Sequence, residues 1–271
     1  MNTDIEQSAT VIAERAPRAK PAVGLILGSG LGSLAQVVED PVVISYADLP
    51  GFPKVGVAGH AGQLTLGEIS GTAVAVMLGR AHYYETGAAD AMKTPVRTLR
   101  EIGCETLVVT NAAGSTDEAT GPGSVMLITD HIAFAGPSPL FGEVGNNRFV
   151  DLSQAYDPDH QSALRAAAHR LGISLAEGVY MWFCGPHFET PAEIRMAQII
   201  GASAVGMSTV PEVILARHAG MRVAALSIIT NLAAGMSALK LSHQQTLAVA
   251  AKAAGDVQAL LTDFLGNYSN S

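Results

Sequence analysis

The sequence predicts an α/β protein in which a central, mixed and largely parallel β-sheet is flanked by helices, within a single domain of residues 1–271. Two observations lead to this prediction. The chain has 271 residues, of which 48% are hydrophobic, enough to bury one large core. Short apolar runs rich in β-branched residues also alternate with longer segments of helical periodicity. Because these runs are apolar on both faces, they are typical of strands covered by helices on two sides.

The predicted elements follow one another along the chain. The N-terminal segment, MNTDIEQSATVIAERAP, has the spacing of an amphipathic helix and lacks the continuous apolar stretch of a signal peptide. The apolar runs that predict strands are 22–27, 73–78, 106–110, 125–128, 179–183, 202–207 and 223–230. The helical patterns cover 90–102, 158–171, 191–200, 211–219 and 242–264. Pro191 and Pro211 fit the first turns of their helices, where a missing N–H removes no hydrogen bond.

Charge and composition disfavour several classes of protein. The formal net charge is -8 and Lys and Arg form no block, so no nucleic-acid partner is expected. Cys104 and Cys184 lie far apart without a C-x-x-C pattern, which indicates neither a disulfide framework nor a zinc site and fits a cytoplasmic protein. The most apolar long stretch, 221–239, is interrupted by charged, amide and glycine residues, so no membrane span is expected.

Polar or glycine-rich segments follow several of the predicted strands. In parallel sheets, ligands bind at the carboxyl ends of the strands, so these segments are expected to meet in one site. They are GSGLGS (28–33), GRAHYYETG (79–87), TNAAGST (110–116), GPHFET (185–190) and GMSTVPE (206–212).

Two of these segments have the chemistry of an anion site. The glycine-rich turn at 28–32 can direct backbone N–H groups at a phosphate, although Ser33 replaces a glycine of the dinucleotide fingerprint and a plain strand-to-helix turn fits equally well. Arg80 and His82 alternate on an extended segment, so both side chains can face one oxyanion. The alternative is a surface arginine and an incidental histidine.

Two further residues are suited to reading a heterocycle. Glu189 follows a run ending in Trp182 and Phe183, where an unpaired carboxylate is costly unless a donor meets it. Its alternative is an acid at the N-terminus of a helix that begins with Pro191. Asn231 ends the run 223–230 and can both donate and accept hydrogen bonds, or it is a turn-forming residue.

Two catalytic classes find little support. Ser208 lies in GMSTV, which lacks the second glycine of a nucleophile elbow and so disfavours acyl transfer. Neither H-E-x-x-H spacing nor a Cys/His cluster occurs, so no metal site is expected.

Taken in order, the motifs resemble one family along most of the chain. They are GSGLG, PGF followed by GHAG, GR.H.YE.G, TNAAG, RF.D.S.AYD, GP.FET, AVGMSTVPE and S.ITN. This ordered set, from about Val23 to His243, resembles the trimeric purine nucleoside phosphorylases, a family that also contains methylthioadenosine phosphorylases. Two positions depart from the pattern: His187 stands where relatives often have a small or amide residue, and Leu232-Ala233 stand where some have a lysine.

The resemblance implies roles for particular residues. Those implied to bind phosphate are Ser29, Arg80, His82, Ala112 and Ser208, with Asn111 beside them. Those implied to contact the ribose are Tyr84, Met207 and His243, with Phe149 reaching into the site of a neighbouring subunit. Those implied to bind the base are Glu189, Asn231, Phe188 and Val205. His60 and Glu85 are implied to support these groups, and His82, Glu189 and Asn231 to be catalytic.

The resemblance also implies a reaction. A cytoplasmic homotrimer would cleave purine ribo- and 2′-deoxyribonucleosides reversibly, preferring inosine and guanosine, to free base and (deoxy)ribose 1-phosphate in purine salvage. Inorganic phosphate would be the co-substrate, and no metal or cofactor would be needed. Two alternatives remain: a methylthioadenosine phosphorylase, in which an acid commonly replaces the amide of Asn231, and a noncatalytic nucleotide-binding module.

Overall fold

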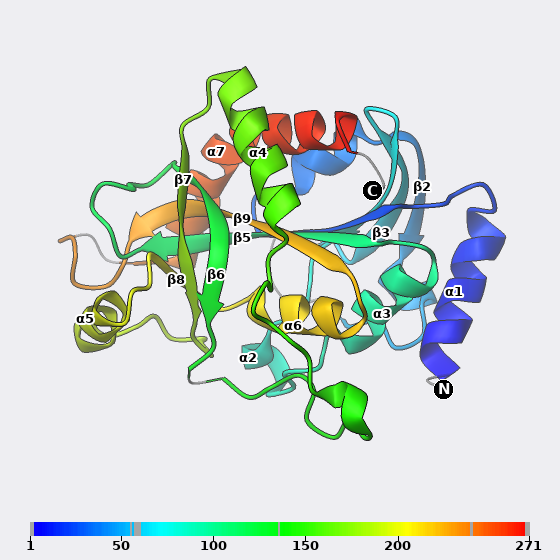
Figure 1. The fold of residues 1–271 in the computed structure, drawn as a ribbon, viewed down its shortest axis with the longest axis horizontal. Helices are drawn as coiled ribbons and strands as arrows, with labels where there is room; N and C mark the ends of the chain where they lie inside the picture. Colours follow the sequence, from blue (N-terminus) through cyan, green and yellow to red (C-terminus); the bar gives the residue numbers. More distant parts are fainter. Residues whose placement is uncertain (1–2, 55, 57–60, 135, 239–240, 269–271) are drawn as a thin grey trace.

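A computed structural model of the chain describes residues 3–54, 56, 61–134, 136–238 and 241–268 (Figure 1). The strands are β1 (Val23–Leu27), β2 (Glu39–Ser45), β3 (Gln63–Ile69), β4 (Thr72–Leu78), β5 (Thr106–Ser115), β6 (Val125–Ile132), β7 (Leu175–Trp182), β8 (Ala204–Gly206) and β9 (Arg222–Leu232). The helices are α1 (Thr3–Arg15), α2 (Tyr83–Thr86), α3 (Lys93–Glu101), α4 (Pro158–Leu171), α5 (Pro191–Ile199), α6 (Val210–His218) and α7 (His243–Gly266).

The strands form one mixed sheet in the order β2-β3-β4-β1-β5-β8-β7-β6-β9. Five of the nine pairings between the described strands are parallel, which confirms the prediction of a mixed, largely parallel sheet. In addition, β5 pairs with β9, so that β5, β8, β7, β6 and β9 close into a small barrel. This closure brings the second half of β5 beside the end of β9, where the candidate ligand groups lie.

The core lies on both faces of the sheet. All five residues of β1 are buried, and its side chains alternate between the two faces. Val23, Leu25 and Leu27 pack in the cluster that includes α4 and α7, whereas Ile26 packs in the cluster that includes α1, α3 and α6. Figure 1 shows these two groups of helices on opposite sides of the strands.

Two strands of the structure were not predicted from the sequence. In β2, EDPVVIS, most residues are exposed and Ile44 is the buried one, as expected for a strand at the edge of the sheet. The neighbouring β3, QLTLGEI, mixes polar with apolar residues. Neither forms a continuous apolar run, which was the pattern used for prediction. The predicted strand 202–207 is also shorter in the structure, at Ala204–Gly206.

The predicted helix starts are confirmed. Pro191 and Pro211 lie in the first turns of α5 and α6. Thr190 accepts from the backbone N–H of Glu193 at the start of α5, and Glu193 accepts from that of Thr190 in return.

A buried histidine joins α4 to the sheet at the end of the barrel opposite the candidate site. His160 Nε2 lies 2.9 Å from Thr106 Oγ1, which lies 2.9 Å from the hydroxyl of Tyr268. Burial lowers the pKa of His160 from 6.5 to about 4. Between these two pH values the unfolded chain binds a proton that the folded protein excludes. The contribution of His160 to stability is therefore present above pH 6.5 and is lost as the pH falls toward 4.

We expect the free energy of unfolding to fall by about 2 to 3 kcal/mol more in the wild type than in His160→Gln between pH 7 and pH 4. Urea denaturation at several pH values measures this difference. His169→Gln, an exposed position on the same helix, is the matched control and should keep the wild-type pH dependence. An unchanged pH dependence in His160→Gln would contradict the expectation.

Candidate active site

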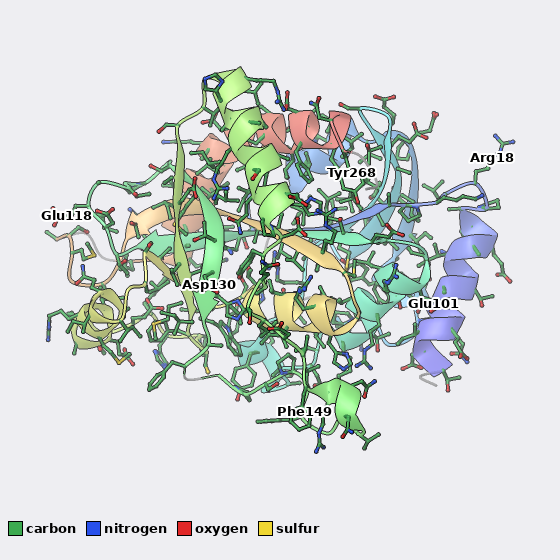
Figure 2. All side chains as sticks on the ribbon, viewed as in Figure 1. Arg18, Glu101, Glu118, Asp130, Phe149 and Tyr268 are labelled. Carbon is green, nitrogen blue, oxygen red and sulfur yellow. The ribbon has the colours of Figure 1, made fainter. Side chains whose placement is uncertain are left out.

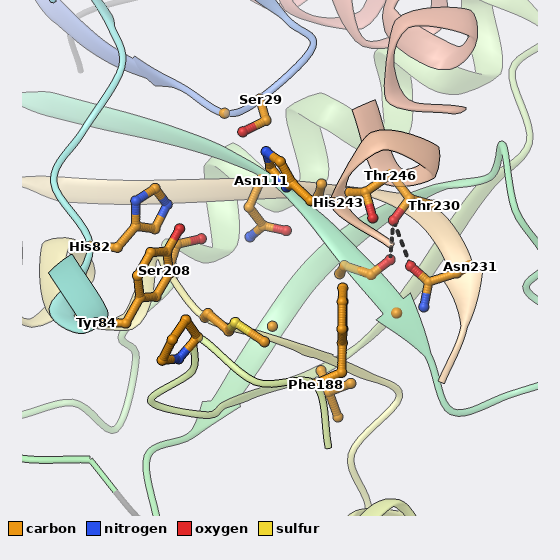
Figure 3. A pocket seen from close by; sticks show the side chains of 18 of the residues that line it. Ser29, His82, Tyr84, Asn111, Phe188, Ser208, Thr230, Asn231, His243 and Thr246 are labelled. Carbon is orange, nitrogen blue, oxygen red and sulfur yellow. Dashed lines mark hydrogen bonds between the residues drawn. The ribbon is translucent and has the colours of Figure 1, made fainter. Parts of the chain in front are cut away.

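The segments that follow the strands meet in one pocket of about 460 Å³, a volume typical of small-molecule sites. Thirteen of the residues predicted for the site line it: Ser29, Arg80, His82, Tyr84, Asn111, Ala112, Phe188, Glu189, Val205, Met207, Ser208, Asn231 and His243. Figure 3 shows Ser29, His82 and Ser208 toward one end and Asn231 with Thr230 toward the other. The segments that follow the strands therefore meet in one pocket, as expected from the order of the strands.

The glycine-rich turn after β1 crosses the second half of β5 at very close range. A Cβ on Gly28 would lie 2.8 Å from the Cα of Asn111 and 2.8 Å from the carbonyl oxygen of Thr110. Gly28 N–H also donates to Thr110 Oγ1 at 3.0 Å. Only glycine permits this approach, which places Ser29 in the pocket wall together with Asn111 and Ala112.

Arg80 is a buried residue of the pocket wall, so the alternative of a surface arginine is wrong. Its side chain is 1% exposed. Nη1 donates to Thr209 Oγ1 at 3.3 Å and to Glu212 Oε1 at 3.2 Å, and Nη2 donates to the backbone carbonyls of Ile26 and Thr110. Both terminal nitrogens thus bond to the protein, which differs from the open guanidinium fork that the sequence suggested.

His82 is oriented by Glu85, the predicted supporting residue. Glu85 Oε1 accepts from the backbone N–H of His82 at 2.7 Å and lies 3.1 Å from its Nδ1, while Oε2 accepts from Gly56 N–H at 3.0 Å. Because a carboxylate only accepts, Nδ1 of His82 holds the proton in this contact. The ring of Tyr84 stacks on that of His82 with the centroids 4.8 Å apart. Glu85 therefore joins the segment at Gly56 to the end of the pocket that Ser29, His82 and Ser208 line.

Glu189 is a buried carboxylate at the other end of the pocket. It is 7% exposed, and its Oε1 has no hydrogen-bond partner among the described residues. Burial raises the pKa of this carboxyl, and the nearby Glu193 adds to the effect while His187 opposes it. Thr190 and Glu193 cap α5, so the alternative role of Glu189 as the acid of that helix start is not supported. The geometry suits a ligand N–H that donates to Glu189.

Asn231 lies within β9 rather than in a turn, and its amide orientation is fixed. Oδ1 accepts from Thr230 Oγ1 at 2.9 Å, as Figure 3 shows. Nδ2 donates to the carbonyl oxygen of Leu232 at 3.0 Å. A flipped amide would set Oδ1 against that carbonyl, two acceptors at hydrogen-bond distance. A Cβ on Gly114 would lie 2.9 Å from Nδ2, so glycine is needed there too. The second hydrogen of Nδ2 remains for a ligand acceptor.

Met207 and Ser208 follow the short strand β8, on a turn that the side chain of Tyr180 contacts. The backbone N–H of Ser208 donates to the hydroxyl of Tyr180 at 3.3 Å, and a Cβ on Gly206 would lie 2.3 Å from that same hydroxyl. Tyr180 is fully buried inside the barrel. The barrel interior therefore determines where these two pocket residues lie.

Two polar residues that line the pocket had no role assigned from the sequence: Thr230, noted only as one of the pair that ends its strand, and Thr246, which was missed. Each had a signal. Thr230 directly precedes Asn231, and Thr246 lies three residues after His243 on α7, a spacing that puts both on one face of the helix.

Glu85, which contacts His82, and Phe149 are the predicted residues with a described position that do not line this pocket. Phe149 is 75% exposed and projects from the surface, as Figure 2 shows. His60 lies outside the described residues. In the part of the chain that the structure describes, no three His, Cys, Asp or Glu side chains are grouped as metal ligands would be. None of the described helices is both long and apolar enough to cross a membrane.

The pocket at the strand ends thus combines hydroxyl and basic side chains at one end with a fixed amide and a buried carboxylate at the other. The chain belongs to the phosphorylase superfamily, whose family model matches residues 22–266. Purine nucleoside phosphorylase 1 of Geobacillus stearothermophilus is 47% identical over 272 residues, 99% of each chain.

Solved structures of purine nucleoside phosphorylases from Schistosoma mansoni share the fold. Isoform 2, in complex with cytosine and ribose 1-phosphate, has a TM-score of 0.94 at 35% identity, covering 100% of this chain and 98% of that one. The structure of S. mansoni purine nucleoside phosphorylase in complex with inosine has a TM-score of 0.93 at 34% identity, covering 100% of this chain and 98% of that one. The structure in complex with adenosine has a TM-score of 0.93 at 35% identity, covering 100% of this chain and 99% of that one. These similarities place the chain among the purine nucleoside phosphorylases.

Proposed function

We propose that the chain catalyses the reversible phosphorolysis of purine nucleosides, with inosine and guanosine and their 2′-deoxy forms as preferred substrates. The products are the free base and (deoxy)ribose 1-phosphate, and the setting is purine salvage in the cytoplasm. The observation that supports this best is that one pocket joins a wall suited to an anion with the buried carboxylate of Glu189, whose Oε1 has no hydrogen-bond partner among the described residues. Inorganic phosphate is the co-substrate, and no metal or cofactor takes part.

The proposed mechanism needs no covalent bond to the protein. Phosphate, held near Ser29, His82 and Ser208, attacks C1′ of the ribose while the C1′–N9 bond breaks and its electron pair leaves with the purine. The sugar gains oxocarbenium character, which the phosphate beneath it stabilises. The leaving purine gains negative charge, which the Nδ2 donor of Asn231 stabilises at N7 and O6. Glu189 accepts the N1–H of the base.

Release of hypoxanthine from inosine, assayed with and without phosphate, tests this function. We expect release to require phosphate and to be unaffected by a metal chelator, because the pocket supplies anion-binding groups and no group of metal ligands among its described residues. Binding without release would instead support a noncatalytic module. Faster cleavage of methylthioadenosine than of inosine would instead support a methylthioadenosine phosphorylase.

We also propose that the enzyme is a homotrimer in which Phe149 completes a neighbour's site. Phe141, Val144 and Phe149 are 72%, 82% and 75% exposed, a large apolar surface for one short segment. Glu143 joins this segment to α3, because its Oε1 lies 2.8 Å from Arg97 Nη2 and 3.3 Å from Lys93 Nζ. A heterologous contact of this kind closes into a ring.

Phe149→Ala is expected to raise the KM for inosine about tenfold with little change in thermal stability, since an exposed aromatic at an interface contributes to binding and not to the core. Steady-state kinetics and sedimentation measure the two effects. Ile199→Ala, another exposed apolar position at 84%, is the matched control and should leave KM unchanged. Full activity in a demonstrated monomer would refute this role for Phe149.

A further inference from the structure

We propose that Glu212 sets the anion affinity of the pocket: it is the buried counter-charge of Arg80, and it acts on phosphate through that guanidinium. The inference rests on the proposed function only in taking inorganic phosphate as the ligand. The proposal predicts the direction in which the affinity for phosphate changes. Removal of the Glu212 charge makes phosphate bind more tightly, whereas loss of a merely structural contact would make it bind more weakly.

The first step of the argument is the burial of the pair. Arg80 and Glu212 are 1% and 2% exposed, and Nη1 lies 3.2 Å from Oε1. Glu212 occupies the first turn of α6, two residues after the helix begins. A buried ion pair is costly to break from one side, because the remaining charge is left uncompensated. Without its partner, the cation of Arg80 would be compensated best by an anion in the pocket that it lines.

The second step is the position of Arg80 relative to the ligand groups. Its terminal nitrogens bond to Thr209, Glu212 and two backbone carbonyls, so its charge acts on the pocket from within the wall. Asn111, another residue of this wall, donates through Nδ2 to the same Thr209 Oγ1 at 2.8 Å. One hydrogen-bond network therefore connects the charges of Arg80 and Glu212 to the side chain of Asn111.

Thr209 shows that this network holds the backbone as well. It has φ 74° and ψ −53°, an unusual conformation for a β-branched residue. Its hydroxyl meets Arg80 on one side and Asn111 on the other, and lies 3.3 Å from the hydroxyl of Ser208. The ion pair of Arg80 and Glu212 is thus bonded to the network that contacts Ser208.

The third step is the charge balance at the phosphate end. His82, which lines the same pocket, is also bonded to a carboxylate, that of Glu85. Arg80 and His82 thus each have an acidic partner, and hydroxyl and backbone donors supply much of the binding of phosphate. Such a balance favours release of ribose 1-phosphate as well as binding of phosphate.

The test uses the full-length protein, with inorganic phosphate alone as the first probe. The phosphate concentration dependence of the thermal midpoint gives a dissociation constant without any nucleoside. For Glu212→Gln we expect this constant to fall about tenfold, because a unit charge near the anion is removed while the side-chain length is kept. Glu212→Asp, which keeps the charge, should stay within about twofold of the wild type.

Kinetics supply a second readout. Glu212→Gln should lower the KM for phosphate and lower kcat, as ribose 1-phosphate leaves more slowly, with the KM for inosine unchanged. Asp157→Asn is the matched control. It breaks the ion pair with Arg222 at the other end of the barrel, where Nε lies 2.8 Å from Oδ2, and should lower stability without changing phosphate binding.

Weaker or unchanged phosphate binding in Glu212→Gln overturns the inference, as does a wild type that phosphate does not stabilise. If Glu212→Gln folds only when phosphate is present, the inference is supported, since phosphate then compensates Arg80. If it folds in neither condition, the inference fails. A wild type that binds phosphate but releases no hypoxanthine refutes the proposed function and leaves Glu212 to be judged on binding alone.

Discussion

Inosine is expected to be cleaved with a kcat/KM about 10⁴-fold higher than that of adenosine. A 6-oxopurine offers N1–H as a donor to Glu189 and O6 as an acceptor to the amide of Asn231. Adenosine reverses both, because its 6-amino group donates and its N1 has a lone pair that would face the carboxylate. The amide cannot simply flip to suit adenosine, since its Oδ1 would then oppose the carbonyl of Leu232.

Asn231→Asp is expected to narrow this difference, since a carboxylate accepts from a 6-amino group and repels O6. The narrowing is limited, because one carboxylate oxygen would take the place of Nδ2 beside the Leu232 carbonyl. Asn267→Asp, at the exposed C-terminal end of α7, is the matched control. Measurement of kcat/KM for inosine and for adenosine in the wild type and both variants tests this expectation. Equal turnover of inosine and adenosine by the wild type would show that these base-reading roles are wrong.

Glu189→Ala is expected to lower kcat/KM for inosine by about 100-fold or more, because a charged hydrogen-bond acceptor in a buried site is lost. Adenosine turnover should not improve, since the variant supplies no new partner for its N1. Glu193→Ala, four residues away and partly exposed at the start of α5, is the matched control. A loss of similar size in both variants would point to a structural defect at the helix start.

The same carboxyl group predicts a pH dependence. Its pKa is raised, so it takes up a proton at a higher pH than an ordinary glutamate. Inosine needs the charged acceptor, and kcat/KM should fall as the pH falls through that raised pKa. Protonated Glu189 can donate to N1 of adenosine, so the preference for inosine should contract at the same time. Glu189→Gln should lose this part of the acid limb, whereas an identical pH profile would contradict the assignment.

Local sequence patterns were sufficient for much of the fold. The apolar run 106–110 predicted β5 because a strand buried on both faces needs apolar residues at every position. Pro191 marked the start of α5 because proline suits a first helical turn. By contrast, β2 and β3 were missed, since strands with an exposed face or edge mix polar and apolar residues. The pairing of β5 with β9 joins segments more than 100 residues apart, so no local sequence pattern predicts it.

For the site, the sequence by itself determined which groups are present: a glycine turn before Ser29, a basic pair at Arg80 and His82, and an acid and an amide at Glu189 and Asn231. It did so because each group directly follows an apolar strand, and strand ends meet at one edge. Only the tertiary structure decided how these groups are used. Arg80 is paired with Glu212 from a distant helix, and the amide of Asn231 is oriented by Thr230 and the Leu232 carbonyl. Charge compensation and hydrogen-bond direction depend on distances of a few ångströms, which arise only when the barrel closes.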